Sequence, residues 1–433
     1  MDRRSFIKGV GAAMFMPAII PASALGRDGF VAPSNRVVMG SIGLGGMGSN
    51  NTNSFLGDKR VQMVALCDPC MSDNRYGYGH NNTCGAEVFK QRKHLTDAKV
   101  YTDFRELLAR DDIDAITTAT PDHWHAIIGI ACANAGKDVY GEKPLTRTIE
   151  EGRYLSNAVL RNGIIWQTGS WQRSVRDFWY TAELVRNGAI GKVKLIKIGL
   201  PSNSKVPPLA PEKVPETLDW NMWLGPAADA EFHPYRAFTT WRFFSEYSAG
   251  KIADWGAHHL DIAQWAMGYH MQGAKTIEPI HVEWQKDGFY DLPTSFAVRY
   301  TYERGEVVEM SDKYPMGLEI IGENGTIWAD RGRLASNPIG IIDRKIKPDS
   351  ERIYALEVPG SHQSAFIDSV LNRRATVTDI ETAHRTNTGC LLGEIAYRTG
   401  RKIVWDWKTE KIIGDEQAQR LCSRAYRGNW QLV

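Results

Sequence analysis

A glycine-rich turn between an apolar strand and a helical stretch is the strongest constraint on the fold of this chain. Residues 36–43 read as a buried strand, and the turn that follows has the pattern GxGxxG. A second predicted strand, residues 61–68, ends at Asp68, twenty residues after the last glycine of the pattern. This order of strand, glycine turn, helix, strand and acidic residue predicts a dinucleotide-binding unit.

Each glycine of the turn has a distinct expected role. Gly43 permits the tight turn, Gly45 lets backbone amides approach a pyrophosphate, and Gly48 lets helix and strand pack closely. Gly46 and Met47 complete the predicted phosphate site. The Asp68 carboxylate can accept hydrogen bonds from the adenosine ribose and would repel a 2′-phosphate. We therefore expect NAD rather than NADP.

Strands continue to alternate with helices up to about residue 168. A strand at 114–120, a helix at 122–136 and a strand with its loop at 138–144 predict a parallel, doubly wound α/β sheet, the Rossmann fold. Tryptophan- and proline-rich loops then appear, followed by a helical segment and alternating strands. We expect a Rossmann domain over 35–168 and a C-terminal α+β domain with a largely antiparallel open sheet over 169–433.

Composition excludes some classes of protein. Of the 433 residues 43% are hydrophobic, which is enough for large buried cores. Lys and Arg total 52 against 50 Asp and Glu, and no basic stripe interleaved with aromatic residues is present. Nucleic acid is therefore not an expected partner.

The first 26 residues resemble an export signal. Arg3 and Arg4 are paired, a short apolar stretch follows, and small residues end the segment. Pro17 and Pro21 interrupt the apolar stretch, which is too short for a stable membrane span. We expect a twin-arginine signal, removed on export to the periplasm or another exported location after the protein has folded around its cofactor.

The cysteines form no paired CxxC array of the zinc type. Cys67 and Cys70 make one CxxC at the end of a predicted strand. In an oxidising compartment they could form a disulfide, with each other or with Cys84; buried thiols without a partner are the alternative.

The segment DWGAHHLDIAQWA, from Asp254, concentrates acidic and imidazole side chains at helical spacing. On a regular helix Asp254, His258, Asp261 and Trp265 share one face, and His259 is turned about 100° away. A metal site, an acid/base pair and the polar edge of a buried helix are the three interpretations. Adjacent imidazoles cannot both face one ion and HExxH is absent, so we favour the acid/base pair and expect no metal.

Three groups fit the oxidation of a secondary alcohol. His258 is the candidate base, and Asp254 is expected to orient it and stabilise its imidazolium. Lys143 can donate to the substrate oxygen and stabilise alkoxide charge. The preceding loop HPYRAFTTWR combines aromatic and cationic residues that suit a sugar ring. The expected substrate residues are Lys143, His258 and His259 with Tyr235, Arg236, Trp241 and Arg242.

Three further stretches resemble the Gfo/Idh/MocA oxidoreductase family: TPDHWHA from Thr120, GEKPLT from Gly141 and DWGAHHLD from Asp254. The resemblance implies that Lys143 is the catalytic lysine and that Asp254 and His258 are its acid/imidazole pair. It also implies that Glu142 and Lys143 border the nicotinamide, and that Thr120, Pro121 and His125 lie beside its ribose. Family members form oligomers through the open sheet, so a homodimer or homotetramer is expected.

Three functions follow from these expectations. The first is an exported NAD-dependent oxidoreductase that holds its cofactor tightly and acts on a secondary hydroxyl of a sugar or glycoside. The second is a redox-neutral NAD-dependent glycoside hydrolase, which needs an additional base such as His259, Tyr235 or His233. The third is a noncatalytic sugar-binding protein.

Overall fold

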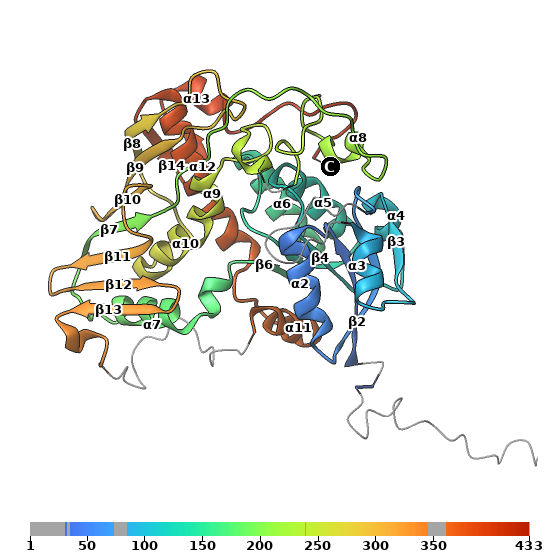
Figure 1. The fold of residues 1–433 in the computed structure, drawn as a ribbon. Coiled ribbons are helices and arrows are strands. Elements are labelled where there is room, and N and C mark those ends of the chain that lie inside the picture. The colour runs from blue at the N-terminus through green and yellow to red at the C-terminus, as the bar shows by residue number, and fades with distance from the viewer. Residues whose placement is uncertain (1–30, 33–34, 73–84, 239, 345–360, 433) are drawn as a thin grey trace, which may run out of the picture.

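The computed structural model describes residues 31–32, 35–72, 85–238, 240–344 and 361–432 (Figure 1). The predicted export signal, residues 1–26, and Cys84 lie outside the described residues. Figure 1 shows two sheets, the six-stranded one on the right and the nine-stranded one on the left.

The N-terminal sheet is parallel throughout and has the order β3-β2-β1-β4-β5-β6. Its central strands β4 and β5 are buried at every position, as expected where helices cover both faces of a parallel sheet. This confirms the predicted Rossmann topology. The strands are β1 (Val37–Ile42), β2 (Val61–Cys67), β3 (Lys99–Tyr101), β4 (Ala115–Thr118), β5 (Asp138–Gly141) and β6 (Trp166–Thr168).

Helices connect these strands, and local sequence signals set their ends. The longest, α6, begins at a capping box formed by Thr148 and Glu151 and ends at Gly163, which has the left-handed conformation typical of a helix C-terminus. The helices of this domain are α2 (Gly46–Leu56), α3 (Ala86–Arg92), α4 (Phe104–Leu108), α5 (Asp122–Asn134) and α6 (Ile149–Asn162).

The C-terminal sheet is mixed but mostly antiparallel, with the order β13-β12-β11-β7-β10-β9-β8-β14-β15. Among these pairs only β7 and β10 run parallel. This confirms the predicted open sheet. Its strands are β7 (Val193–Gly199), β8 (Thr276–Glu283), β9 (Ser295–Thr301), β10 (Val307–Ser311), β11 (Gly317–Gly322), β12 (Thr326–Asp330), β13 (Arg333–Asn337), β14 (Ile403–Asp406) and β15 (Lys411–Ile412).

Helices α7 (Arg176–Arg186), α10 (Gly256–Met267) and α12 (Ile380–Thr399) pack on one face of this sheet and bury its core. Short helices lie in the connections: η2 (Trp171–Ser174), α8 (Trp220–Leu224), η3 (Trp241–Phe243), α9 (Lys251–Asp254), η4 (Ile339–Ile341) and α13 (Glu416–Arg420).

Helix α11 (His362–Asn372) lies on the N-terminal sheet although it belongs to the C-terminal half of the sequence. Its Phe366, Ile367 and Val370 share a core with Val37 and Phe55. The chain therefore crosses between the two sheets more than once, and the N-terminal core is completed by residues from the C-terminal half.

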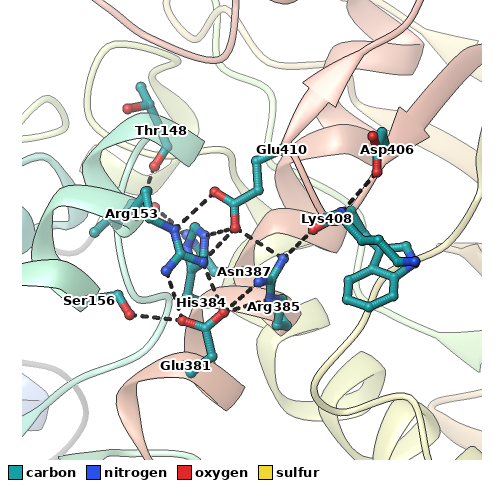
Figure 2. A network of polar contacts seen from close by, with 12 residues as sticks. Thr148, Arg153, Ser156, Glu381, His384, Arg385, Asn387, Asp406, Lys408 and Glu410 are labelled. Carbon is teal, nitrogen blue, oxygen red and sulfur yellow. Dashed lines mark hydrogen bonds and ion pairs between the residues drawn. The ribbon is translucent and has the colours of Figure 1, made fainter. Parts of the chain in front are cut away.

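A network of charged groups joins the two halves (Figure 2). Arg153 of α6 donates to Glu381 of α12 at 2.9 Å and to Glu410, which lies between β14 and β15. His384 and Arg385 of α12 contact Glu410 at 3.0 Å each. Burial alone would raise the pKa of both glutamates, but the hydrogen bonds and the arginine charges outweigh it and hold the pKa of Glu381 and Glu410 at about 2.

Replacement of Glu410 by Gln is expected to lower the free energy of unfolding by about 2–3 kcal/mol, because it leaves Arg153, His384 and Arg385 without their shared carboxylate. Since the pKa of Glu410 is about 2 in the folded chain against an ordinary 4.5, its stabilisation is present above pH 4.5 and lost as the pH falls toward 2.

Urea unfolding between pH 7 and pH 3 measures both effects. The variant is expected to lose less stability on acidification than the parent. Glu303→Gln, which removes an exposed pair with Lys275, is the matched control and should change neither value. Parallel pH profiles of Glu410→Gln and the parent would contradict this account.

Candidate active site

The glycine turn is packed so that two of its glycines accept no side chain. A Cβ on Gly43, whose φ is +82°, would lie 2.7 Å from the Ala119 carbonyl oxygen, and one on Gly48 would lie 1.8 Å from the Gly43 carbonyl oxygen. A Cβ on Gly45 would meet no atom within 4 Å. The turn is therefore closed toward the sheet and open at its second glycine, where the predicted pyrophosphate would lie.

Helix α2 starts at this open point. Its N-cap is Gly45, and no side chain satisfies the first backbone N–H groups. Gly46 and Met47, in the first turn of the helix, line the adjoining cavity. Uncapped amides at a helix N-terminus attract a phosphate, so these residues fit the pyrophosphate of a dinucleotide.

Asp68 stands at the carboxyl end of β2, beside the turn. Its carboxylate accepts hydrogen bonds from the backbone N–H groups of Leu44 at 2.6 Å and Cys70 at 2.8 Å. Burial raises the pKa of Asp68 to about 6, against the opposing effect of these two donors. The side chain lines the cavity and keeps lone pairs for the two ribose hydroxyls.

Replacement of Asp68 by Ala is expected to lower the ratio of NAD affinity to NADP affinity about 10- to 100-fold. This is the binding free energy that hydrogen bonds to one carboxylate contribute. Because the pKa of Asp68 is about 6, parent NAD affinity should also fall as the pH drops from 7 to 5 and the carboxylate is protonated. Titration of cofactor-depleted protein measures both. An unchanged ratio would move the ribose contact to another residue; Asp68→Asn, which keeps the shape, controls for damage to the turn.

One open cavity of about 1190 Å³ begins at the glycine turn and runs along the carboxyl edge of the N-terminal sheet. It passes Thr120 and Pro121 and reaches Glu142 and Lys143 after β5. A covering segment, residues 218–238 and 240–242, lies over it. This segment contributes Met222, Trp223, Phe238, Trp241 and Arg242 to the lining.

Glu142 and Lys143 are fixed at the far end of the cavity. The Glu142 carboxylate accepts from the Asn51 amide at 2.9 Å, and it lies so close to Gly169 that a Cβ there would be 2.6 Å from its oxygen. The Lys143 Nζ donates to the backbone oxygen of Asp254 at 2.9 Å and to its Oδ1 at 2.8 Å.

Asp254 is a shared counter-ion. Besides Lys143, its carboxylate contacts Lys251 at 2.9 Å and Arg242 at 3.5 Å. Burial alone would raise the pKa of Asp254, but the three cations outweigh burial and hold it well below its usual value. The site therefore keeps Asp254 ionised, and Lys143 is held by a charge-assisted hydrogen bond.

Family models match both halves of the chain. The oxidoreductase family's NAD-binding Rossmann fold covers residues 37–170, and the family's C-terminal α/β domain covers residues 203–432. The chain belongs to the Gfo/Idh/MocA oxidoreductase family. Its N-terminal domain is an NAD-binding Rossmann fold, as the resemblance of the three motifs implied.

Known proteins extend this finding. The chain is 25% identical over 330 residues to the uncharacterized oxidoreductase YrbE of Bacillus subtilis, covering 72% of this chain and 84% of that one. It is 31% identical over 175 residues, 35% of each chain, to an alpha-N-acetylgalactosaminidase of Shewanella oneidensis. The solved WlbA dehydrogenase of Bordetella pertussis, in complex with NADH and UDP-GlcNAcA, shares the fold with a TM-score of 0.60 at 16% identity, covering 86% and 98%.

The acidic helix of this Gfo/Idh/MocA oxidoreductase differs from the expected single face. Helix α9 ends at Asp254 and α10 starts at Gly256, so the predicted single helix is interrupted at Trp255. The Asp254 carboxylate accepts from Lys143, and among the described side chains it accepts no hydrogen bond from His258. The prediction that Asp254 orients His258 is therefore replaced by a role in holding the lysine.

Asp261 does not reach the cavity. Its carboxylate forms a bidentate ion pair with Arg173, at 2.7 Å to each oxygen, and both side chains are buried. Arg173 also lies over the Trp265 ring at 4.8 Å. The predicted second acid is thus a core ion pair, because an arginine from another segment neutralises it.

The two adjacent histidines have different surroundings. His258 is 5% exposed and contacts the rings of Trp171 and Trp255. Burial, together with the charges of Lys143 and Arg331, holds its pKa well below the usual value. Its Nδ1 has no hydrogen-bond partner in the described part of the chain. The imidazole is therefore neutral, its unpartnered Nδ1 is buried, and His258 is not among the residues that line the described cavity.

His259 is fully buried and packs against Phe178 and Trp255. Burial, with the charge of Arg331, lowers its pKa to about 3. It does not line the described cavity, so the structure places this predicted substrate residue in the core between helices.

His125 braces two loops of the cavity instead of lining it. Its Nδ1 lies 2.7 Å from the Pro144 carbonyl oxygen and its Nε2 2.8 Å from the Thr120 carbonyl oxygen. It thereby joins the loop after β4 to the loop that carries Lys143. The buried Thr120 Oγ1 has no partner among the described residues, and Thr120 lines the cavity as predicted.

The structure places the residues predicted to bind the sugar ring in two different surroundings. Trp241 and Arg242 line the cavity. Tyr235 is 48% exposed and outside it, and Arg236 stacks on the Phe244 ring at 4.2 Å in an aromatic cluster. Sequence reasoning missed Met222 and Trp223 in the cavity lining and Trp171, Trp255 and Arg331 around His258. The tryptophan- and proline-rich stretch 200–245 was a signal for the first two only.

Three further features concern metal binding, the thiols and membrane crossing. Across the described ranges, no group of three or more His, Cys, Asp or Glu side chains is arranged to hold a metal ion. Cys67 and Cys70 are buried free thiols. None of the described helices combines the length and apolar character that crossing a bilayer requires.

Proposed function

We propose that this Gfo/Idh/MocA oxidoreductase is an exported NAD-dependent enzyme that oxidises a secondary hydroxyl of a sugar or glycoside. The observation that carries the proposal is the position of Lys143. Its ammonium group is held on Asp254 at one end of the cavity whose other end is the glycine turn. A fixed cation beside the nicotinamide end of a cofactor cavity suits an alcohol oxygen that gains negative charge.

Two side chains divide the acid/base work. When bound, NAD supplies the acceptor for the hydride that leaves the substrate carbon. Lys143 donates a hydrogen bond to the substrate oxygen and stabilises its developing charge, while Asp254 keeps the ammonium group in position. The free Nδ1 of His258 accepts the hydroxyl proton.

A covered cavity supports tight retention of the cofactor. The covering segment bridges to the N-terminal domain at Cys70 and Leu218, and the Trp124 indole donates to the Trp223 carbonyl oxygen at 2.9 Å. A periplasmic enzyme needs a retained cofactor because that compartment has no free NAD pool. The paired Arg3 and Arg4 motif supports export by the twin-arginine route, which carries folded, cofactor-loaded proteins.

A redox-neutral glycoside hydrolase is the second candidate. The likeness to the Shewanella alpha-N-acetylgalactosaminidase favours it. Its cycle needs another base to remove a proton from carbon after the sugar is oxidised. The candidates for that base are His233, Tyr235 and His259; like His258, none of them is among the described residues that line the cavity. The glycosidase needs two such bases at the substrate and the dehydrogenase needs one, which favours the dehydrogenase.

One experiment separates the two. Protein purified from the periplasm with its cofactor is mixed with a panel of glycosides, and reduced-nicotinamide absorbance and free sugar are followed together. Reduced cofactor and keto-sugar without cleavage support the dehydrogenase, and cleavage without net reduction supports the glycosidase. Absence of both reactions with every glycoside counts against the proposed function.

We also propose a homo-oligomer formed through the open sheet. On β12, Ile327 and Ala329 are buried, whereas Trp328 points to the opposite face and is 40% exposed. Met316, 39% exposed, lines the same surface groove. Sedimentation analysis is expected to give a dimer or tetramer; a monomer would contradict this part of the proposal.

A further inference from the structure

Arg331 occupies the tip of the hairpin between β12 and β13. Asp330 pairs with Arg333, so Arg331 and Gly332 alone form the turn, and Gly332 has a φ of +74°. A two-residue turn holds its first residue in a defined direction. Arg331 is exposed, but the fold directs it toward the junction of the two domains.

The Arg331 guanidinium lies between two indole rings. Its central carbon is 4.5 Å from the Trp171 ring centre and 4.5 Å from the Trp255 ring centre. Trp171 belongs to η2, which follows the last strand of the N-terminal sheet, and Trp255 is the break between α9 and α10. Three separate segments therefore converge to fix one cation.

This arrangement leaves the edge of the guanidinium open. Within the described residues Arg331 has no hydrogen bond and no ion pair, and the carboxylates that act on it from a distance are Asp330 and Asp254. Asp254 is already shared by Lys143, Lys251 and Arg242. The Arg331 guanidinium therefore has both faces covered by indole rings, while its N–H groups contact no carboxylate of the described residues. Such a planar set of donors is suited to binding an oxyanion.

The two tryptophans place this cation beside the proposed reaction centre. The His258 ring centre is 5.9 Å from that of Trp171 and 6.2 Å from that of Trp255. His258 itself is 5% exposed, and its Nδ1 has no partner among the described atoms. A substrate that reaches this nitrogen lies next to the Trp171, Arg331 and Trp255 stack.

We propose that Arg331 binds an oxyanion of the substrate, a carboxylate or a phosphate, so that the preferred substrates are acidic sugars or their glycosides. This inference rests on the proposed function, since it concerns the substrate of the same site. The bidentate geometry of guanidinium favours a planar carboxylate, and a phosphate offers the same pair of acceptor oxygens.

The experiment compares matched acidic and neutral ligands on the NAD-loaded protein. Glucuronate against glucose, galacturonate against galactose, and glucose 6-phosphate against glucose are titrated by calorimetry, and hydride transfer is followed by absorbance. We expect the parent to bind at least one acidic member about 10- to 100-fold more tightly than its neutral partner. The uronates and the phosphate distinguish the two sources of the oxyanion.

Arg331→Gln is expected to remove this preference, so that the acidic and neutral members of each pair bind with similar affinity. Arg331→Lys should restore only part of it, because an ammonium group lacks the planar fork. Arg304→Gln is the matched control: Arg304 stacks on Tyr269 at 4.7 Å in another hairpin of the same sheet and is outside the site. Folding of each variant is checked by its NAD content.

Two results would overturn the inference. The first is a parent that binds no acidic member more tightly than its neutral partner. The second is an Arg331→Gln variant that loses affinity equally for both members of a pair, which would make the stack structural. Acid-selective binding without any hydride transfer would instead contradict the proposed function and leave the oxyanion site standing.

Discussion

Replacement of Lys143 by Met is expected to slow hydride transfer about 10²- to 10⁴-fold while the content of bound NAD stays unchanged. The methionine keeps the length of the side chain but removes the donor that faces the substrate oxygen. Lys143 lines the cavity at the end away from the glycine turn and Asp68, so the proposed pyrophosphate and ribose contacts remain. Single-turnover reduction of the bound cofactor measures the rate, and acid release of NAD measures its content.

Lys251→Met is the control for this effect. Lys251 contacts the same Asp254 carboxylate at 2.9 Å but does not line the described cavity. If Lys143 served only to neutralise Asp254, the two variants would lose activity equally; we expect less than a 10-fold loss for Lys251→Met. A Lys143→Met protein with unchanged turnover would remove Lys143 from the catalytic groups, and one without NAD would make Lys143 a cofactor residue.

Local sequence was sufficient to predict which residues meet at the glycine-turn end of the cavity. The turn at Gly43–Gly48, the position of Asp68 and the placement of Lys143 after β5 depend on a few adjacent residues and on strand order. The edge of a parallel sheet brings these strand ends together in any doubly wound fold. For this reason the predicted cofactor residues Gly43, Gly45, Asp68 and Thr120 line one cavity.

The same reasoning was weaker for the acid and imidazole groups. Helical spacing placed Asp254, His258 and Asp261 on one face, but a break at Trp255 and an ion pair from Arg173 separate them. Neither the break nor the distant arginine has a local signal. The assignment of Asp254 to Lys143 depends on tertiary structure that spans more than a hundred residues.

Segments that approach from the other domain were not predictable either. Helix α11 completes the N-terminal core, and the covering segment closes the cavity, yet both belong to the C-terminal half of the chain. Their apolar residues pack against surfaces whose identity only the fold reveals. The Trp171, Arg331 and Trp255 stack has the same origin, because each residue lies at the end of a different element.

Trp223 anchors the covering segment to the rest of the protein. Its ring packs against Tyr247 at 5.1 Å and His123 at 5.4 Å, and its backbone oxygen accepts from the Trp124 indole. Trp223 also lines the cavity, so it is both an anchor of the segment and part of the cofactor's surroundings.

Replacement of Trp223 by Ala is expected to release the cofactor. The segment loses its aromatic anchor, a change that costs about 3–5 kcal/mol for a buried tryptophan, and the cavity opens to solvent. We expect NAD to dissociate at least about 10-fold faster and to copurify at well below one molecule per chain. Stopped-flow competition with a fluorescent dinucleotide measures the rate, and unfolding curves confirm that the domain is intact.

Trp220→Ala is the matched control, because Trp220 stacks on Trp223 at 4.7 Å within the same segment but lies outside the cofactor cavity. If the covering segment retains NAD through direct closure, Trp223→Ala releases it far faster than Trp220→Ala does. Met222→Ala, which trims the lining with less loss of packing, should have an intermediate effect. Equal release rates in all three variants and the parent would mean that the glycine turn and Asp68 alone hold the cofactor, and an exported enzyme would then have to retain it without a cover.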